Sequence, residues 1–500
     1  MIERLGLVTT QLPTTSSGVM ALLVVLLPLL LGVLGVAGRP TRGWPVVLVS
    51  LLALLALLPL LVLMQLVVTH GTQVWVLDLG GLALHWRANG LTLLLLLLTQ
   101  LLVLASAAYA PTYLRAAVQA QGSGPAWLWP LMGLLASSLS VIWLAADLLA
   151  LYIGLELMGL TAVGLMLLPG RIEALTAGVR YLLLALIGSL AFLLGVALLL
   201  GNWGRLDLAG LAEVVEPGPV LWVAMALLSA GLLLKAAAFP LHAWLAPVHG
   251  SAWTPVSALH AALVIKASFF IALQLWLVLA PQAAAAAWVV GGMGAAAVVW
   301  GGLLAWRADK LKDVVAWSTV SQLGYLLIGF PLLIGTVPAV VSIAWNGVWL
   351  QLLAHSLAKA AMFLAVGNLM LATGESRVSG LAGASRRFPL ALLSFGIAAI
   401  SLVGLPPSAG FTAKWLLLHA ALAAGQWPWL VVLAAGTLLS AAYVFRVFRY
   451  SFVEDVELED YQTVPLRMDL IALVLALASL LLGLTATWPL ALLQIVGGAP

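Results

Sequence analysis

Long apolar runs constrain this chain more than any other feature of its sequence. Many stretches of about 20 residues hold little besides Leu, Ala, Val and Gly, and a helix of about 20 apolar residues crosses a hydrocarbon core about 30 Å thick. Hydrophobic residues make up 64% of the chain and charged residues 8%. This balance excludes a soluble domain and predicts an all-α polytopic membrane protein.

We place about fourteen transmembrane helices, at 17–38, 45–69, 89–110, 126–145, 147–168, 173–201, 219–246, 253–280, 284–306, 312–333, 338–372, 389–420, 427–450 and 468–490. Between the second and third spans, residues 71–90 alternate apolar and polar side chains around Gly80-Gly81, which predicts a small surface hairpin. The acidic run 454–460 predicts a solvated loop.

The distribution of basic residues predicts an orientation. Of 21 lysines and arginines, fourteen flank the loops that follow odd-numbered spans and three flank the opposite side. The positive-inside rule then places the odd loops in the cytoplasm and both termini outside, in a bacterial inner membrane. The formal charge of +4 requires no nucleic-acid partner. The chain has no cysteine, which excludes disulfides, thiolate metal sites and iron–sulfur ligation.

Several ionisable side chains fall inside the predicted spans. An unpaired charge at the bilayer centre costs roughly 2.5–3.5 kcal/mol on insertion scales, so such residues by default mark an ion or proton pathway. The densest region is 235–266, which holds two lysines and three histidines. The candidates for a proton pathway are Glu156, Lys235, His242, His260, Lys266, His355, Lys359 and Lys414.

Prolines interrupt two of these spans. Pro240 lies in span 7 and Pro406-Pro407 in span 12, and a proline inside a helix removes an N–H from the hydrogen-bond ladder. The breaks are five spans apart, which is typical of inverted-topology repeats. We therefore divide the chain into N-terminal helices (1–125), a first five-helix repeat (126–280), a second (281–450), and an acidic loop with a last helix (451–500).

Helical spacing predicts which of these groups share a face. His355 and Lys359 are four residues apart and do so. His242 follows Lys235 by seven residues, nearly the same face of an unbroken helix, whereas His260 and Lys266 are six apart and diverge. Glu156 is either a structural partner or a carboxylate that controls protonation of a lysine on another span. His249 lies near a cytoplasmic turn, where a surface role and proton uptake both remain open.

Five motifs resemble, in order and spacing, those of the proton-conducting antiporter-like subunits of respiratory complex I, hydrogenase-4-type hydrogenases and Mrp-type sodium/proton antiporters. They are LYIGLELMGL, FPLHAWLAPVHGSAWTPVSALHAALVIK, KDVVAWSTVSQLGYLL, HSLAKAAMFLAVGN and GLPPSAGFTAKW. The resemblance covers about residues 85–450. Two departures are Ala246-Pro247-Val248, where the family often has Pro-Asp-Ala, and Asn89-Gly90 in place of Asp-Gly.

The resemblance implies fourteen helices, ten of which form two inverted five-helix repeats, and a proton-translocating subunit of a multisubunit complex. It implies that Glu156 pairs with Lys235, that Lys266 and Lys359 are central lysines with His355 beside the latter, and that Lys414 ends the second half-channel. The implied partners are other integral membrane subunits, protons and the lipid bilayer, with sodium and the parent complex left open. No metal or cofactor is implied. The chain itself carries no catalytic chemistry, although the parent complex can be an oxidoreductase.

Two other classes compete with this interpretation. A polytopic enzyme acting on lipid or glycan substrates usually carries catalytic residues in sizeable interfacial loops, but the loops here are short and the deep charges are mostly lysines. A haem-binding electron carrier would use two histidines among His260, His355 and His419.

Overall fold

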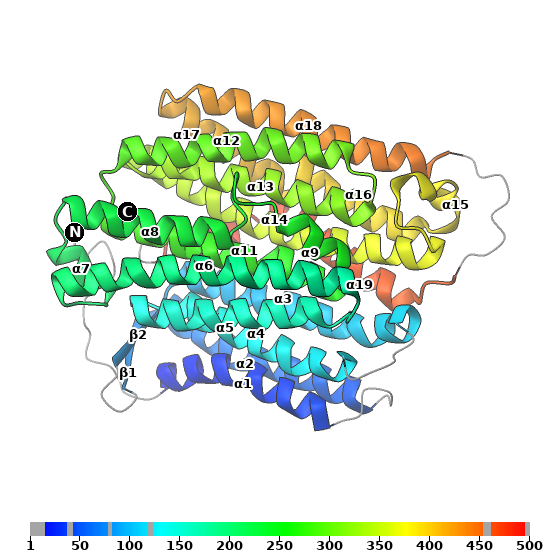
Figure 1. Ribbon diagram of the computed structural model, residues 1–500, viewed down its shortest axis with the longest axis horizontal. Helices are drawn as coiled ribbons and strands as arrows, with labels where there is room; N and C mark the ends of the chain where they lie inside the picture. Colours follow the sequence, from blue (N-terminus) through cyan, green and yellow to red (C-terminus); the bar gives the residue numbers. More distant parts are fainter. Residues whose placement is uncertain (1–15, 38–43, 79–82, 119–123, 454–461, 496–500) are drawn as a thin grey trace.

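The computed structural model describes residues 16–37, 44–78, 83–118, 124–453 and 462–495. Most helices run side by side along a common direction, with the β1–β2 hairpin and α7 at one end of the bundle and α15 at the other (Figure 1). The elements are α1 (Ser16–Ala37), α2 (Trp44–His70), β1 (Gln73–Asp78), β2 (Ala83–Ala88), α3 (Gly90–Tyr113), η2 (Leu114–Val118), α4 (Gly124–Leu144), α5 (Leu148–Leu167), α6 (Ile172–Trp203), α7 (Leu208–Val214), α8 (Pro219–Lys235), α9 (Leu245–Ser251), α10 (Thr254–Leu259), η3 (His260–Val264), α11 (Ile265–Leu279), α12 (Ala284–Arg307), α13 (Leu311–Leu333), α14 (Pro338–Thr373), η4 (Val378–Leu381), α15 (Ala384–Arg387), α16 (Pro389–Val403), α17 (Ala409–Ala423), α18 (Pro428–Ser451), α19 (Leu466–Leu484) and α20 (Thr487–Leu493).

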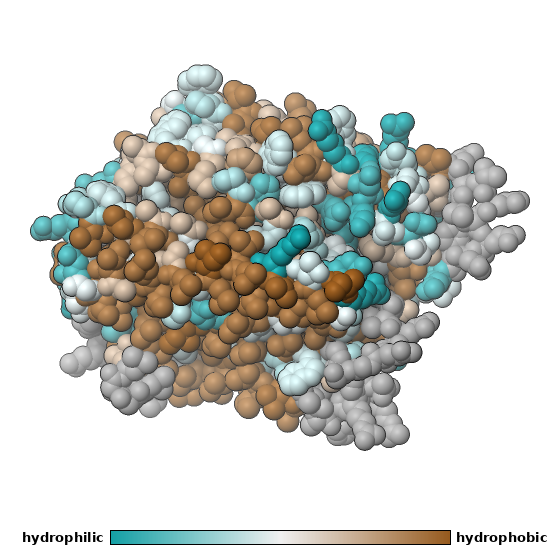
Figure 2. All heavy atoms as spheres, viewed as in Figure 1, coloured by the Kyte–Doolittle hydropathy of each residue, from teal (hydrophilic) through white to brown (hydrophobic). Residues whose placement is uncertain are grey.

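The chain is a multi-pass integral membrane protein, as predicted. Within the described residues, eleven helices are long and apolar enough to cross a bilayer. Figure 2 shows hydrophobic residues over most of the middle of one face, with hydrophilic residues mainly toward the ends. Three shorter apolar helices, Leu55–His70, Pro219–Lys235 and Pro389–Val403, lie in predicted spans 2, 7 and 12. The predicted count of fourteen spans is therefore not confirmed, and two of the short helices end at the proline breaks.

The helix of predicted span 7 ends five residues before Pro240. We predicted one segment over 219–246, but α8 ends at Lys235 and α9 starts at Leu245. Pro240 explains the early end, because its ring would clash with the carbonyl four residues back, at Ala236. The connecting backbone turns sharply: Ala237 has a left-handed φ of 55°, and the Phe239-Pro240 peptide bond is cis.

Span 12 has a corresponding break. Helix α16 ends at Val403, Gly404 takes a left-handed φ of 86°, and the Pro406-Pro407 peptide bond is cis. Helix α17 then starts after Ser408, whose hydroxyl accepts a hydrogen bond from the Phe411 N–H at 3.2 Å. Such a cap satisfies one of the free N–H groups at a helix start. The predicted break at Pro406-Pro407 is confirmed in position.

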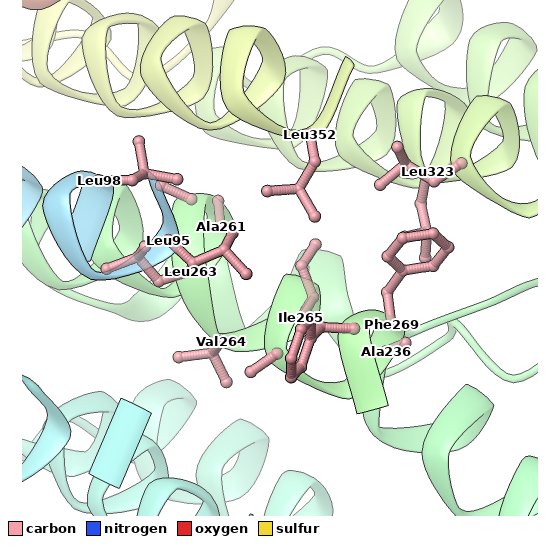
Figure 3. Packing of buried hydrophobic residues seen from close by; sticks show 14 of the residues in the cluster. Leu95, Leu98, Ala236, Ala261, Leu263, Val264, Ile265, Phe269, Leu323 and Leu352 are labelled. Atoms are coloured by element: carbon pink, nitrogen blue, oxygen red, sulfur yellow. The ribbon is translucent and has the colours of Figure 1, made fainter. Parts of the chain in front are cut away.

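Span 8 contains a π-helical turn that the sequence did not predict. Residues His260–Val264 form η3, between α10 and α11. Figure 3 shows this region packed in one apolar cluster with neighbouring helices; its labelled members include Ala261, Leu263, Ile265, Leu95, Leu98 and Leu352. A π-turn widens the helix and rotates the residues that follow it, and such turns often occur at functional sites.

The predicted hairpin is present and attached to the bundle by Asp147. Strands β1 and β2 pair antiparallel, from Gln73 opposite Ala88 to Asp78 opposite Ala83, while Gly80-Gly81 lies outside the described residues, as does the acidic run 454–460. The Asp147 carboxylate accepts from the His85 N–H at 2.6 Å and caps α5 through the Ala150 N–H at 2.7 Å. Burial raises the pKa of the Asp147 carboxyl, and these hydrogen bonds oppose that shift.

Helices α6 and α8 approach each other through glycines. A Cβ atom on Gly231 would lie 2.3 Å from the Gly188 carbonyl oxygen, and one on Gly188 would lie 2.9 Å from the Gly231 oxygen. Small residues allow such backbone contact between membrane helices. This close crossing brings the end of α8, and hence Lys235, against α6.

We predict that Gly231→Ala destabilises the protein by about 1–3 kcal/mol, because the added methyl group forces the two backbones apart. Gly201→Ala on α6 is the matched control: a Cβ atom there meets nothing within 4 Å, so the better helix propensity of alanine leaves stability unchanged or slightly raised. Thermal unfolding in detergent, followed by tryptophan fluorescence, measures both variants. Equal midpoints for the two would contradict the close crossing.

Candidate functional site

Glu156 and Lys235 form a salt bridge between α5 and the last residue of α8. Lys235 Nζ lies 3.3 Å from Glu156 Oε1, and the lysine side chain is 5% exposed while the glutamate is 22% exposed. Glycines leave room for the lysine: a Cβ atom on Gly188 would lie 3.2 Å from Lys235 Cγ, and one on Gly159 would lie 3.5 Å from Nζ. A buried amine thus has one carboxylate partner, and that carboxylate reaches the surface of the chain.

Aromatic rings connect the end of α8 with the π-turn. The Trp244 indole N–H donates to the Leu234 carbonyl at 3.1 Å, which ties the broken segment back onto α8. The Trp244 ring stacks on Tyr181 at 4.3 Å, and the His260 ring lies edge-on to both. His260 Nε2 is 3.2 Å from the Tyr181 hydroxyl. His260 therefore lies next to the lysine-bearing helix end, separated from it by two aromatic side chains.

His249 is completely buried, so the surface role left open from sequence is wrong for it. Its ring lies edge-on to His260 at 5.1 Å and stacks on Phe363 at 4.9 Å. Neither ring nitrogen has a hydrogen-bond partner among the described residues. Since buried polar atoms are normally bonded to protein or water, His249 is a further candidate for the site.

His242 is not on the same face as Lys235. The expectation assumed an unbroken helix, but α8 ends at Lys235 and residues 236–244 are not helical. The His242 ring packs on Phe239 at 5.3 Å and edge-on to Trp317 at 5.7 Å. It is 7% exposed and lies beside the break, away from the Glu156–Lys235 pair.

The π-turn provides an acceptor for Lys266. This side chain is 1% exposed, and its Nζ donates to the Ala261 carbonyl five residues earlier. Because the π-turn changes the backbone hydrogen-bond pattern of the helix at this point, the Ala261 carbonyl faces the Lys266 amine. His260 and Lys266 also interact electrostatically, although their spacing in a regular helix predicted divergence.

Lys359 and His355 lie on α14, and both are buried. Lys359 Nζ donates to the Val315 carbonyl of α13 at 2.9 Å and to the Ser318 hydroxyl. Both ring nitrogens of His355 lack a partner among the described residues. His355 lies within electrostatic range of Lys266, Lys359 and Lys414.

Lys414 occupies the break in span 12. Its Nζ donates to the carbonyls of Leu402 and Val403 at 2.8 and 3.0 Å and lies 4.4 Å from the centre of the Tyr325 ring. In an unbroken helix those two carbonyls would accept from the N–H groups four residues on, at positions 406 and 407, where proline has none. The lysine thus takes the place of the missing backbone donors.

The structure adds a polar network around Gln322. Gln322 Nε2 donates to the Leu402 carbonyl, which Lys414 also binds, and to Ser440 Oγ, while Gln351 donates to Gln322 at 3.0 Å. Tyr443 donates to Ser440 at 3.2 Å. In the sequence, each of the three helices α13, α14 and α18 carries a polar side chain. The sequence alone does not show that these side chains point toward one another.

Two further polar groups were not predicted. Lys312, counted as a cytoplasmic flank, is 6% exposed and donates to the Ala252 carbonyl at 2.7 Å. The buried amide of Asn368 donates to Asp469 at 2.8 Å and accepts from Tyr109 at 2.7 Å, which links α14, α19 and α3. Lys312 is in the first turn of α13 and Asn368 lies inside α14, five residues before its end.

These residues define a polytopic membrane protein in which two broken helices and a π-turn hold a row of buried amines and imidazoles. The groups interact from His249 and His260 through Lys266 and Lys359 to His355 and Lys414. Within the described part of the chain, no group of three or more metal-ligating side chains comes together. Successive ionisable groups of this kind can pass protons through intervening water.

Comparison with known proteins agrees with this class. A family profile described as NADH:quinone oxidoreductase/Mrp antiporter, TM, matches residues 145–440. The chain therefore belongs to this family, as the motifs had indicated. The "NADH-quinone oxidoreductase subunit N" of Desulforudis audaxviator is 36% identical over 315 residues, which cover 62% of this chain and 61% of that relative. "NADH-quinone oxidoreductase subunit N 1" of Sorangium cellulosum is 32% identical over 69% of this chain and 70% of its own length.

Solved structures share the fold. A chain of the Mrp complex from Dietzia sp. superposes with a TM-score of 0.84 at 24% identity, covering 96% of this chain and 98% of that one. A chain of the membrane-bound sulfane sulfur reductase, an archaeal respiratory membrane complex, gives a TM-score of 0.83 at 24% identity over 95% of this chain and 96% of the other. At this identity the likeness establishes the fold.

We predict that Glu156→Gln and Lys235→Met each lower thermal stability, and that the double variant loses less than the two single losses added together. Each single change leaves one charge of the pair without its partner inside a membrane span, and breaking a buried pair from one side costs up to about 3 kcal/mol where one partner is part-exposed. Unfolding midpoints at neutral pH measure the two single variants and the double variant. Losses that simply add in the double variant would contradict the pairing.

Proposed function

We propose that this chain is a proton-translocating, antiporter-like subunit of a multisubunit energy-converting membrane complex. The observation that carries the proposal is the row of buried lysines. Among these four lysines, only Lys235 has a carboxylate of the described residues within ion-pair distance. Lys266, Lys359 and Lys414 are bonded to neutral carbonyl or hydroxyl oxygens. Such acceptors hold an amine in either protonation state, as a proton relay requires.

In the proposed mechanism, a neighbouring subunit acts on Glu156. This carboxylate is 22% exposed at the surface of the chain, where another membrane subunit can reach it. If Glu156 moves away, the Lys235 ammonium loses its counter-ion in a low-dielectric site and releases its proton. The proton passes across the Tyr181–His260 contact toward Lys266, and then through Lys359 and His355 to Lys414.

The two broken helices support the same proposal. Each places a lysine where helical hydrogen bonding is interrupted, at Lys235 and at Lys414. We keep the division into two inverted halves, 126–280 and 281–450, as part of this proposal, since broken helices at the repeat interface form the transport sites of many carriers. His242 and His249 lie on the loop and the short helix that follow the first break.

The relatives support the assignment to a complex. Those described above are named as subunits of NADH-quinone oxidoreductase, and the solved structures are of an Mrp complex and a respiratory reductase. We propose that this chain likewise assembles with other integral membrane subunits in a bacterial inner membrane, with both termini extracytoplasmic. Redox or ion-gradient energy would enter through those partners. Whether sodium moves with the protons distinguishes the candidate complexes.

We predict that Lys235→Ala abolishes coupled proton transport by the intact complex in liposomes, measured with a pH-sensitive dye. The exposed Lys310 provides the control, and Lys310→Ala keeps transport at the wild-type level because its side chain lies outside the buried row. Assembly is checked by the subunit content of the purified complex. Full transport by an assembled Lys235→Ala complex would refute the proposed function.

A further inference from the structure

Two hollows at one end of the bundle share a wall. The first, of about 1180 Å³, lies between the ends of α12 and α18 and is lined by Trp306, Arg307, Arg446, Arg449 and Tyr450. The second, of about 740 Å³, runs between α16 and α18 and is lined by Pro389, Leu393, Gly396, Ile400 and Val403. Phe445, Phe448 and Phe452 line both. The hollows are therefore adjacent, with these three rings at their boundary, and we call the two together the α16–α18 groove.

The mouth of the α16–α18 groove is basic. Arg446 is held in place: it donates to the carbonyls of Trp306 and Ala308, each at 2.6 Å, and lies 3.4 Å from Asp309. Arg307 and Arg449 are exposed, and neither forms an ion pair with any described residue. Among the residues that the structure describes here, three guanidinium groups and one exposed carboxylate give a net positive charge. All three lie on the side that the basic-residue census predicts to be cytoplasmic, where anionic lipids concentrate.

The remainder of the groove is apolar and as long as a lipid chain. Its wall on α16 extends from Pro389 to Val403, which at 1.5 Å per residue is about 20 Å, more than half of a hydrocarbon core of about 30 Å. Gly396 makes room for the Phe448 ring, because a Cβ atom there would lie 2.9 Å from Phe448 Cζ. Leu393 and Phe445 on its two sides are 50% and 69% exposed.

We propose that the α16–α18 groove binds one anionic phospholipid. Its phosphate would lie between Arg307 and Arg449, and one acyl chain would follow the apolar part between α16 and α18. A basic hollow beside an apolar one about a leaflet long matches this ligand, whereas a soluble phosphate would leave the apolar hollow unused. The proposal rests on these contacts alone and not on proton translocation.

Native mass spectrometry of the full-length chain, purified with the subunits that accompany it, tests the proposal. After delipidation, the protein is titrated with dioleoylphosphatidylglycerol, dioleoylphosphatidylcholine and glycerol phosphate. We expect preferential binding of one phosphatidylglycerol. The Arg307→Gln/Arg449→Gln double variant should weaken it about thirtyfold, from the loss of two basic contacts, and Leu393→Trp should block the chain and weaken it at least tenfold.

Arg467→Gln is the matched control, because Arg467 is also exposed on the predicted cytoplasmic side but does not line the groove; it should leave binding unchanged. Any of three results would overturn the proposal: equal binding of the two phospholipids, unchanged affinity in the double arginine variant, or glycerol phosphate competing as well as the lipid. A neighbouring subunit found cross-linked to residue 393 in the intact complex would do so as well.

Discussion

The fold depends on satisfying lysine amines inside an apolar helical bundle. An amine that finds no acceptor at that depth is costly, and backbone carbonyls inside a regular helix are already bonded. For Lys266 and Lys414 the chain resolves this by interrupting its helices, whereas Lys359 shares the Val315 carbonyl of the continuous helix α13. The carbonyls of Leu402 and Val403, freed by Pro406-Pro407, accept from Lys414, and the Ala261 carbonyl in the π-turn accepts from Lys266. Irregular backbone in the membrane is tolerated only where such partners are present.

The same principle links packing to the site. Glycines on α6 and α8 allow the close crossing that leaves Lys235 against α5 and within 3.3 Å of Glu156. The end of α8 is set by Pro240, and Trp244 returns to bond the Leu234 carbonyl, which places its ring beside His260. Helix break, aromatic contact and ion pair are therefore consequences of one local arrangement. A change in any of them is expected to alter the environment of Lys235.

Much of this followed from the sequence, because apolar runs, prolines and rare charges are local signals. The membrane class, the hairpin strands, the break at Pro406-Pro407 and the positions of the buried lysines needed no tertiary information. The errors arose where tertiary contacts decide. His242 was predicted to share a helix face with Lys235, because the end of that helix was placed too far along the chain. For His249, the sequence did not decide between a surface position and a buried one. The π-turn at His260, the burial of Lys312 and the Gln351–Gln322–Ser440 network depend on neighbouring helices that sequence spacing does not specify.

The most direct measurement is an experimental structure of the chain within its native complex, at a resolution that shows ordered water. The account predicts Lys414 Nζ at hydrogen-bond distance from the Leu402 and Val403 carbonyls, and water molecules that connect the unpartnered nitrogens of His249 and His355 to Lys266, Lys359 and Lys414. A dry site, with those lysine side chains turned toward lipid or individually neutralised by carboxylates, would contradict it.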